Sequence, residues 1–176
     1  MPHPVILLTG GARSGKSKRA LELALGYPNP AFLATAEATD PEMSRRIMDH
    51  QAEREGQFFT FEEPVNLTWA LNQMPKNTGV VVIDCLTLWV NNLLFQFGEQ
   101  TSYSQMDDFL NLLEYPPVPL VIVTNELGMG LVPPDKLSRV FRDLAGRLNQ
   151  QVADRADEVY LMVCGLPVAV KTLESK

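Results

Sequence analysis

The feature that most constrains this chain is a glycine-rich segment, Gly10–Ser17, that lies between an apolar run and a helix-forming run. Its letters, GGARSGKS, match the pattern G-x-x-x-x-G-K-[ST], and Val5–Thr9 precedes it while Lys16–Leu25 follows it. Such a segment turns backbone N–H groups and a helix N-terminus toward phosphate oxygens. A chance glycine-rich turn is the alternative, and the agreement of motif and context argues against it. The sequence therefore predicts a phosphate-binding loop.

Each residue type in this loop has a chemical task. The glycines permit the inward turn of the backbone, Lys16 neutralises the outer phosphates, and the Ser17 hydroxyl can ligate Mg²⁺. The predicted phosphate-binding residues are Gly10, Gly11, Ala12, Arg13, Ser14, Gly15, Lys16 and Ser17.

Short apolar runs alternate with helix-like stretches along the rest of the chain. Such a pattern predicts an α/β fold of the P-loop NTPase type, a mostly parallel sheet with helices on both faces and ligand loops at the carboxyl ends of the strands. The predicted strands are Val5–Thr9, Val80–Asp84, Leu120–Thr124 and Val159–Val163, with weaker ones at Ala31–Ala34 and Phe58–Phe61. The predicted helices are Lys16–Leu25, Pro41–Glu55, Val65–Gln73, Leu86–Phe97, Tyr103–Leu113 and Asp135–Arg155.

Composition limits the remaining possibilities. A chain of 176 residues falls within the usual size of one domain, and we expect a single domain over residues 1–176. A formal charge of −6 gives little support to nucleic-acid binding, and no apolar run approaches the roughly 18 residues of a membrane span. The start of the chain lacks the features of a signal peptide, so we expect a cytoplasmic protein with no membrane insertion. Cys85 and Cys164 have no metal-ligand spacing and are expected to be buried.

Two further sequence features lie where strands end. Asp84 closes the run Val80–Ile83, and an acid at the tip of a buried strand beside a P-loop usually holds Mg²⁺ or its water. An Asp that caps the helix beginning near Leu86 is the alternative. The segment Glu126–Pro134 contains two glycines and two prolines, follows a strand, and is a candidate substrate loop.

Several segments together carry a resemblance to a known family. They are Thr9–Ser17, Ala34–Glu37, Arg46–His50, Asp84–Trp89 with Asn91–Leu93, Val123–Pro133, Phe141–Asn149 and Ala156–Val159. In order and spacing, nearly from end to end, the chain resembles the bifunctional adenosylcobinamide kinase / adenosylcobinamide-phosphate guanylyltransferase family of adenosylcobalamin biosynthesis.

The resemblance implies two reactions. In the first, the γ-phosphate of ATP or GTP passes to the hydroxyl of the aminopropanol arm of adenosylcobinamide. In the second, a histidine attacks the α-phosphate of GTP, pyrophosphate leaves, and GMP passes from a His–GMP intermediate to the cobinamide phosphate, giving adenosylcobinamide-GDP. The resemblance also implies Mg²⁺ as cofactor and a homo-oligomer, a trimer in particular.

The candidate nucleophile is His50. His3 lies between prolines near the N-terminus, a poor place for a positioned nucleophile. On a helix over Pro41–Glu55, His50 and Arg54 share one face with Met43 and Ile47, so the arginine could neutralise phosphate as the N–P bond forms. A histidine at the edge of an amphipathic helix is the alternative without the family match.

Other positions follow from the same resemblance. It places the turn after Ala34, with Thr35, Ala36 and Glu37, against the nucleotide, and simple loop packing is the alternative for Thr35. Glu62 can accept from the N1–H and N2 amine of guanine, whereas a surface acid before Pro64 is the alternative.

The chain departs from the family in two places. Gln51 stands where a basic residue is frequent, and Phe58 stands where Trp is usual, so any stacking on guanine there falls to Phe58. These departures motivate a second hypothesis, a phosphotransferase that has lost guanylyl transfer. A nucleotide-bound scaffold without turnover is a third, which the presence of Lys16, Ser17, Asp84 and His50 disfavours.

The remaining polar residues stay open at the level of sequence. Asn125 and Glu126 end a strand at the expected ligand edge, where they either contact the corrinoid or simply form a turn. Arg142 and Arg147 lie on the long predicted helix, where they either reach phosphate or a neighbouring subunit or, as charged side chains most often do, form the solvated face.

Overall fold

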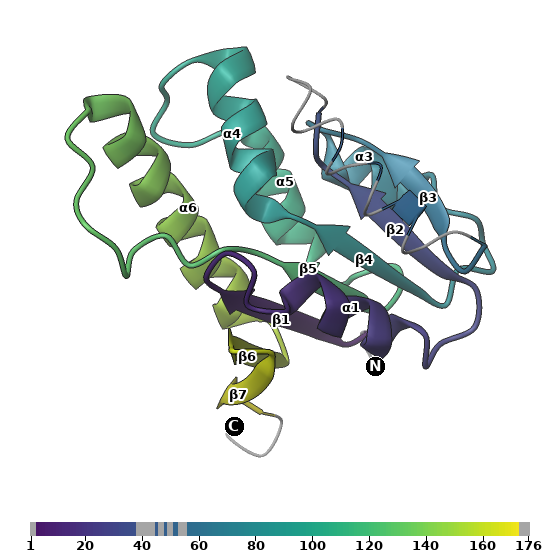
Figure 1. Ribbon diagram of the computed structural model, residues 1–176. Coiled ribbons are helices and arrows are strands. Elements are labelled where there is room, and N and C mark those ends of the chain that lie inside the picture. The colour runs from purple at the N-terminus through teal and green to yellow at the C-terminus, as the bar shows by residue number, and fades with distance from the viewer. Residues whose placement is uncertain (1–2, 38–44, 46–47, 49–50, 53–55, 173–176) are drawn as a thin grey trace.

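The computed structural model describes residues 3–37, 45, 48, 51–52 and 56–172. Its strands form one sheet in the order β3-β2-β4-β5-β1-β6-β7, and only the last pair is antiparallel (Figure 1). The strands are β1 Val5–Gly10, β2 Pro30–Ala34, β3 Phe59–Glu62, β4 Val80–Asp84, β5 Leu120–Val123, β6 Glu158–Val163 and β7 Leu166–Lys171. The predicted α/β architecture with a mostly parallel sheet is therefore confirmed.

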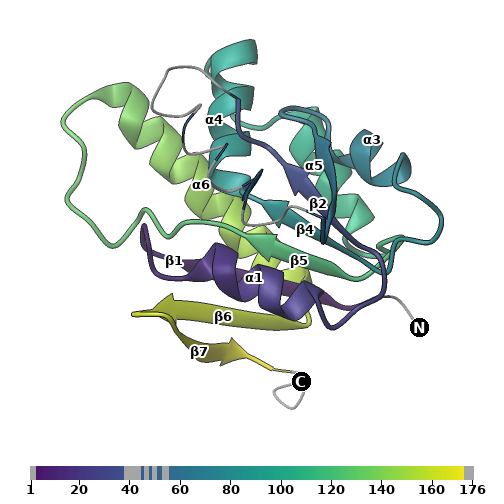
Figure 2. The same ribbon diagram turned by 45° about the vertical axis from the view of Figure 1, so that its right-hand side comes forward.

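Helices cover both faces of this sheet. The labelled helices are α1 Lys16–Ala24, α3 Leu67–Asn72, α4 Leu86–Phe97, α5 Ser104–Leu112 and α6 Lys136–Arg155. Helix α1 lies on one face, and α4, α5 and α6 lie on the other (Figures 1 and 2). Residues of α3 share a core cluster with those of α4, α5 and α6, which places α3 on the second face.

The core follows from the alternation of side chains along each strand. In β1, Val5 and Leu7 pack with α4, α5 and α6, whereas Leu8 packs with Ala20 and Ala24 of α1. Parallel strands buried on both faces read as continuous apolar runs, which is why β1, β4 and β5 were recognisable in the sequence. Two core clusters on opposite faces of one sheet hold the strand ends in place.

Capping fixes where the long helix α6 begins. Asp135 Oδ1 accepts a hydrogen bond from the Ser138 N–H at 2.8 Å, and this bond lowers the pKa of Asp135. The loop before the helix is tied to it, because Arg139 Nη1 donates to the carbonyl oxygens of Pro133 and Pro134 at 3.0 and 2.6 Å. The segment that the sequence suggests as a substrate loop is therefore anchored to α6.

All six predicted strands are present, with ends that shift by one residue at most. The sequence predicts no element after Val163, yet β7 forms there as an antiparallel edge strand. Pro167 cannot donate to a sheet ladder, and an edge strand is where sheets tolerate proline. The predicted helix Pro41–Glu55 falls partly outside the described residues, and its described positions 45, 48, 51 and 52 are helical.

The strand order matters at one functional point. The strand that ends in Asp84 does not lie beside β1, because β5 is inserted between them. The register still places Asp84 level with Val123 and Leu8, at the carboxyl edge of the sheet. Within the described residues, no helix is long and apolar enough to cross a membrane.

Candidate active site

The loop between β1 and α1 has the backbone that its glycines require. Gly10 has φ 145°, and a Cβ there would lie 2.6 Å from the Met162 carbonyl oxygen and 2.9 Å from Ser14 Oγ. Gly15 has φ 95° and directly precedes α1, where its absent Cβ leaves room for Gly165 at 3.1 Å. Both positions lie in the region of φ that favours glycine; Gly10 is also sterically closed to other residues, whereas a Cβ at Gly15 would require Gly165 to shift.

A hairpin turn supports this loop from one side. The Gly165 N–H donates to the Ser14 carbonyl oxygen at 3.0 Å, so the turn between β6 and β7 is bonded to the loop. Cys164 lies in the same turn with φ 52° and is exposed, so the expectation that both cysteines are buried is wrong for Cys164. A residue at the tip of a two-strand turn has no neighbouring layer to cover it.

Lys16 points back into its own loop. Its Nζ donates to the Gly11 carbonyl oxygen at 2.6 Å and to Ser14 Oγ at 3.4 Å, and the residue is only 6% exposed. Burial lowers the pKa of Lys16, and the negative charge of Asp84 partly opposes that shift. The ammonium group therefore rests on backbone oxygens, and a phosphate oxygen in the loop is a stronger partner than these.

Four of the eight predicted phosphate-binding residues, Ala12, Arg13, Lys16 and Ser17, line one cavity of about 330 Å³, whereas Gly10, Gly11, Ser14 and Gly15 are not among its lining residues. Its lining residues are Ala12, Arg13, Lys16, Ser17, Asp84, Cys85, Val123 and Asn125. Lys16, Ser17 and Asp84, far apart in the sequence, meet here as the sequence analysis expects. Cys85, and not Asp84, is the residue at the N-cap position of α4.

The donor set around the cavity suits Mg²⁺ with shared coordination. Among the described residues, no group of three or more His, Cys, Asp or Glu side chains could hold a metal ion. Mg²⁺ usually takes one or two protein oxygens and completes its shell with phosphate and water. The Ser17 hydroxyl and the Asp84 carboxylate are such oxygens, so this cavity fits a metal bound together with a nucleotide.

Asn125 is a further cavity residue that the sequence could not place. It follows β5, and because β5 lies between β1 and β4, Asn125 lies between Lys16 and Asp84. Its backbone is held on both sides: its N–H donates to Thr87 Oγ1 at 2.8 Å, and its carbonyl oxygen accepts from Asn149 Nδ2 at 3.0 Å. Its position at a strand end was the only sequence signal for a role in the site.

The side chains that hold Asn125 form a buried polar network. Thr124 Oγ1 donates to Asn149 Oδ1 at 2.7 Å, and the hydroxyls of Thr124 and Thr87 are 3.3 Å apart. Thr87, Thr124 and Asn149 are each less than a tenth exposed. Buried polar groups with all partners satisfied fix one geometry, so α4, β5 and α6 are locked together behind the cavity.

Hydrogen bonds between Thr35 and Cys85 hold together the backbone around the site. Thr35 is fully buried, and its hydroxyl donates to the Cys85 carbonyl oxygen at 2.9 Å and accepts from the Cys85 N–H at 2.8 Å. The geometry thus supports loop packing for Thr35, since its hydroxyl is engaged within the protein. Burial, together with the nearby Asp84 carboxylate, raises the pKa of Cys85 to about 12, so the thiol stays neutral.

Glu62 lies at the opposite end of the site, at the carboxyl end of β3. A small cavity of about 70 Å³ is lined there by Ala36, Gln51, Glu62 and Asp84 together with apolar residues. Gln51 Nε2 donates to Glu62 Oε1 at 3.1 Å. Because Asp84 lines both this cavity and the phosphate cavity, the two sites are continuous at the sheet edge.

Three other residues that the sequence analysis assigns to nucleotide binding lie in the described structure, and of these only Ala36 lines a cavity with Glu62. Glu37 is exposed just after β2, and Ala36 lines the small cavity. Phe58, the residue expected to stack on guanine, is partly buried and packs edge-on against Phe32, with ring centroids 6.5 Å apart. His50 and Arg54 lie outside the described residues.

Comparison with known proteins gives matches over nearly the whole chain. The model of the cobinamide kinase / cobinamide phosphate guanyltransferase family matches residues 6–170. The bifunctional adenosylcobalamin biosynthesis protein CobU of Salmonella typhimurium is 40% identical over 95% of this chain and 99% of its own. The Pseudomonas aeruginosa bifunctional adenosylcobalamin biosynthesis protein CobP is 40% identical over 94% and 96% of the two chains.

Solved structures that are distant in sequence share the fold. A Pyrococcus horikoshii OT3 protein superposes with a TM-score of 0.56 at 6% identity, over 98% of this chain and 88% of that chain. A prototypical ATPase from the type III secretion system of pathogenic bacteria superposes with a TM-score of 0.53 at 12% identity, over 96% and 57% of the two chains. The P-loop NTPase-like fold is therefore confirmed.

Proposed function

Because the chain belongs to the cobinamide kinase / cobinamide phosphate guanyltransferase family, we propose that one P-loop site carries out both reactions. The first phosphorylates adenosylcobinamide at its aminopropanol hydroxyl with ATP or GTP. The second transfers GMP from GTP to the resulting phosphate and gives adenosylcobinamide-GDP. The observation that carries this proposal is the meeting of Lys16, Ser17, Asp84 and Asn125 around one cavity at the end of β1.

In the kinase step, the acceptor oxygen bonds to the γ-phosphorus while the bond to the β–γ bridging oxygen breaks. The chain contributes positioning and charge: loop N–H groups hold the phosphates, and Lys16 exchanges the Gly11 carbonyl for a phosphate oxygen. Ser17 and Asp84 would hold Mg²⁺, which supplies positive charge to the phosphate oxygens when bound. Asn125 lies where it can donate to the γ-phosphate.

In the guanylyl step, we propose His50 as the nucleophile. A His50 nitrogen bonds to the α-phosphorus and pyrophosphate leaves, after which an oxygen of cobinamide phosphate displaces the histidine and takes the GMP group. Arg54 would neutralise the phosphate during these displacements, and Glu62 would accept from the guanine edge. Support for these roles comes from family membership and from the place of Glu62 at the same sheet edge as Asp84.

The direct test is covalent labelling. Wild-type protein incubated with Mg²⁺ and GTP labelled at the α-phosphate should gain an acid-labile label and release pyrophosphate. His50→Ala should lose the label and retain kinase activity, whereas the matched control His3→Ala should behave as wild type. A label that persists in His50→Ala would rule out this nucleophile.

A second candidate is an enzyme that only phosphorylates cobinamide. Two observations favour it. Phe58, the residue expected to stack on guanine, packs against Phe32, and Gln51 Nε2 donates a hydrogen bond to the Glu62 carboxylate that guanine would need. Kinase turnover without pyrophosphate release from GTP would select this function over the bifunctional one.

We also propose that the protein is a homo-oligomer, as the resemblance implies, and a trimer in particular. Strand β7 supports this, because it is an edge strand that exposes Leu166, Val168 and Val170. Light scattering coupled to size exclusion measures the assembly directly.

We also propose a cytoplasmic location, because both cysteines are free, as is usual in a reducing compartment.

A further inference from the structure

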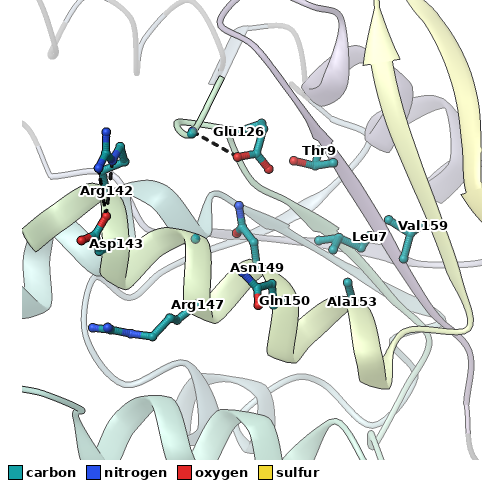
Figure 3. Close-up of a pocket in the computed structure, with 12 residues that line it drawn as sticks. Leu7, Thr9, Glu126, Arg142, Asp143, Arg147, Asn149, Gln150, Ala153 and Val159 are labelled. Carbon is teal, nitrogen blue, oxygen red and sulfur yellow. Dashed lines mark hydrogen bonds and ion pairs between the residues drawn. The ribbon is translucent and has the colours of Figure 1, made fainter. Parts of the chain in front are cut away.

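A second and larger cavity lies next to the phosphate cavity. The chain segment that follows the carboxyl end of β5 separates the two. The larger cavity has a volume of about 530 Å³, and it opens between the end of β1, the loop after β5 and one face of α6 (Figure 3). Consecutive residues divide the two cavities: Asn125 lines the phosphate cavity, and Glu126 lines the larger one. Nothing in the reactions described so far uses this space.

We propose that this cavity binds the acceptor, receiving the hydroxyl- and amide-bearing arm of cobinamide, with Glu126 as the group that bonds the acceptor hydroxyl. The inference rests on the proposed function, since cobinamide is the acceptor that the family implies. It goes beyond that function by assigning a site and residues to the acceptor.

The first argument is a glycine that the protein does not need for its own packing. Gly146 lies in the interior of α6, where glycine costs about 1 kcal/mol relative to alanine. A Cβ at this position would meet nothing within 4 Å, so no neighbouring residue requires the glycine. A larger side chain there would instead occupy the cavity, so the glycine keeps the cavity open.

The second argument is the polar lining. Thr9 lines the cavity, and its Oγ1 is buried without a hydrogen-bond partner in the described part of the chain. Glu126 and Thr9 face each other across one side, and Gln150 and Arg142 contribute an amide and a guanidinium group (Figure 3). A lining with acidic, basic and amide groups suits an uncharged arm that carries amide and hydroxyl groups, such as the aminopropanol arm of cobinamide, better than a purely anionic ligand.

The third argument is the position of Glu126 relative to the phosphates. Its N–H donates to the Gly10 carbonyl oxygen at 3.0 Å, so its backbone is bonded to the first residue of the phosphate loop. Glu126 Oε1 accepts from the Gly128 N–H at 3.1 Å, which leaves the second oxygen for a ligand. As the acceptor oxygen bonds to the γ-phosphorus and the diphosphate leaves, Glu126 takes the hydroxyl proton.

The loop that borders the cavity adds an apolar surface. Met129, Leu131 and Val132 are each more than two thirds exposed, with Leu131 at 96%. A cavity of this size holds an arm of cobinamide and not its macrocycle, so the flat ring would lie outside, against these side chains.

The test compares a variant that fills the cavity with one that leaves it open. Gly146→Leu places a side chain in the cavity and improves helix propensity, so the fold should hold. We expect cobinamide binding, measured by calorimetry, to weaken by about tenfold or more, while GTP binding and labelling from GTP stay as in wild type. The matched control Gln151→Leu adds leucine to an exposed position of the same helix that does not line this cavity, and should bind cobinamide normally.

Glu126→Gln tests the proton acceptor separately. It should lower kinase kcat by about 10²-fold with little change in the KM for ATP or GTP. GMP labelling, which needs no acceptor, should persist in this variant.

The possible results separate the two proposals. Wild-type protein that binds cobinamide, with Gly146→Leu deficient in binding, supports the acceptor site even if no guanylyl transfer is found. Unchanged cobinamide affinity in Gly146→Leu, or wild-type protein that does not bind cobinamide, overturns it. Loss of labelling in His50→Ala concerns only the proposed function.

Discussion

At the phosphate end of the nucleotide site, the structure is buried and held by several hydrogen bonds, whereas at the β3 end the described residues are more exposed and share fewer described contacts. Lys16 and the Thr87, Thr124 and Asn149 network are buried, and the loop is bonded to the β6–β7 turn. Glu62 lies on an edge strand and meets Gln51 through one exposed hydrogen bond. The difference indicates that triphosphate binding is preorganised, and that selection of the base depends on contacts that a ligand must replace.

The largest expected effect is at the phosphate end. Lys16→Met should lower kinase activity by about 10³-fold, because one charged donor to the transferring phosphate is lost. Steady-state kinase assays with cobinamide measure this loss. Lys18→Met, an exposed lysine two residues away, is the control and should keep its activity. Equal losses in both variants would contradict the role of Lys16.

The same variant has a pH signature in its stability. Because burial lowers the pKa of Lys16, the folded protein carries this charge at a cost that is fully present below the folded pKa. That cost disappears as the pH rises through the folded pKa toward the unfolded value of 10.5. We expect Lys16→Met to be at least as stable as wild type at neutral pH, and urea titrations should show the difference shrinking toward pH 10.5.

Next in size is a change of base selectivity at the exposed end. A carboxylate accepts two hydrogen bonds from guanine, whereas an amide offers one oxygen and a competing donor. Glu62→Gln should therefore weaken GTP binding by about tenfold, since a bond to a charged group is worth about 1.5–3 kcal/mol. ATP binding is the internal control and should not change, and an equal loss for both nucleotides would place the role of Glu62 elsewhere.

The contrast between the two ends also explains what the sequence could predict. The loop Gly10–Ser17 is a local motif whose chemistry depends on neighbours in the chain, so its residues were identified without a structure. Asn125 depends on the insertion of β5 between β1 and β4, which no local pattern encodes. The sequence analysis did not predict the hairpin with Cys164 and β7. Pro167 argues against a strand, and an exposed edge strand does not need the continuous apolar run of a buried one.

Thr35 also shows that the local sequence does not determine which residues meet in space. Its position after β2 suggested a nucleotide contact, yet its hydroxyl bonds to Cys85, a residue 50 positions away. Such long-range pairing is decided by which strands are adjacent, here β2 and β4. That the chain forms one domain, and that His50 and Arg54 act as proposed, stay predictions.

An effect on the free energy of unfolding is expected when the buried network is opened. Thr87→Val keeps the shape of the side chain and leaves the Asn125 N–H without its acceptor, which should cost about 1–3 kcal/mol of stability. Kinase kcat should fall as well, because the position of Asn125 is no longer fixed. Thr68→Val is the control: its hydroxyl is buried without a hydrogen-bond partner among the described residues, so its removal should not destabilise the protein. Denaturant titrations of both variants measure the comparison.

The smallest expected effect tests whether Gln51 competes with guanine for the Glu62 carboxylate or orients that carboxylate for guanine. Gln51 Nε2 now occupies Glu62 Oε1, an oxygen that guanine would need, so binding of GTP must break this hydrogen bond. An exposed hydrogen bond of this kind contributes about 0.5–1 kcal/mol, so Gln51→Ala should tighten GTP binding by about two- to fivefold. ATP affinity should stay constant, because adenine does not offer the donor pair that Glu62 accepts. Weaker GTP binding in Gln51→Ala would instead mean that Gln51 orients the carboxylate for guanine, and the exposed end would then be as preorganised as the phosphate end.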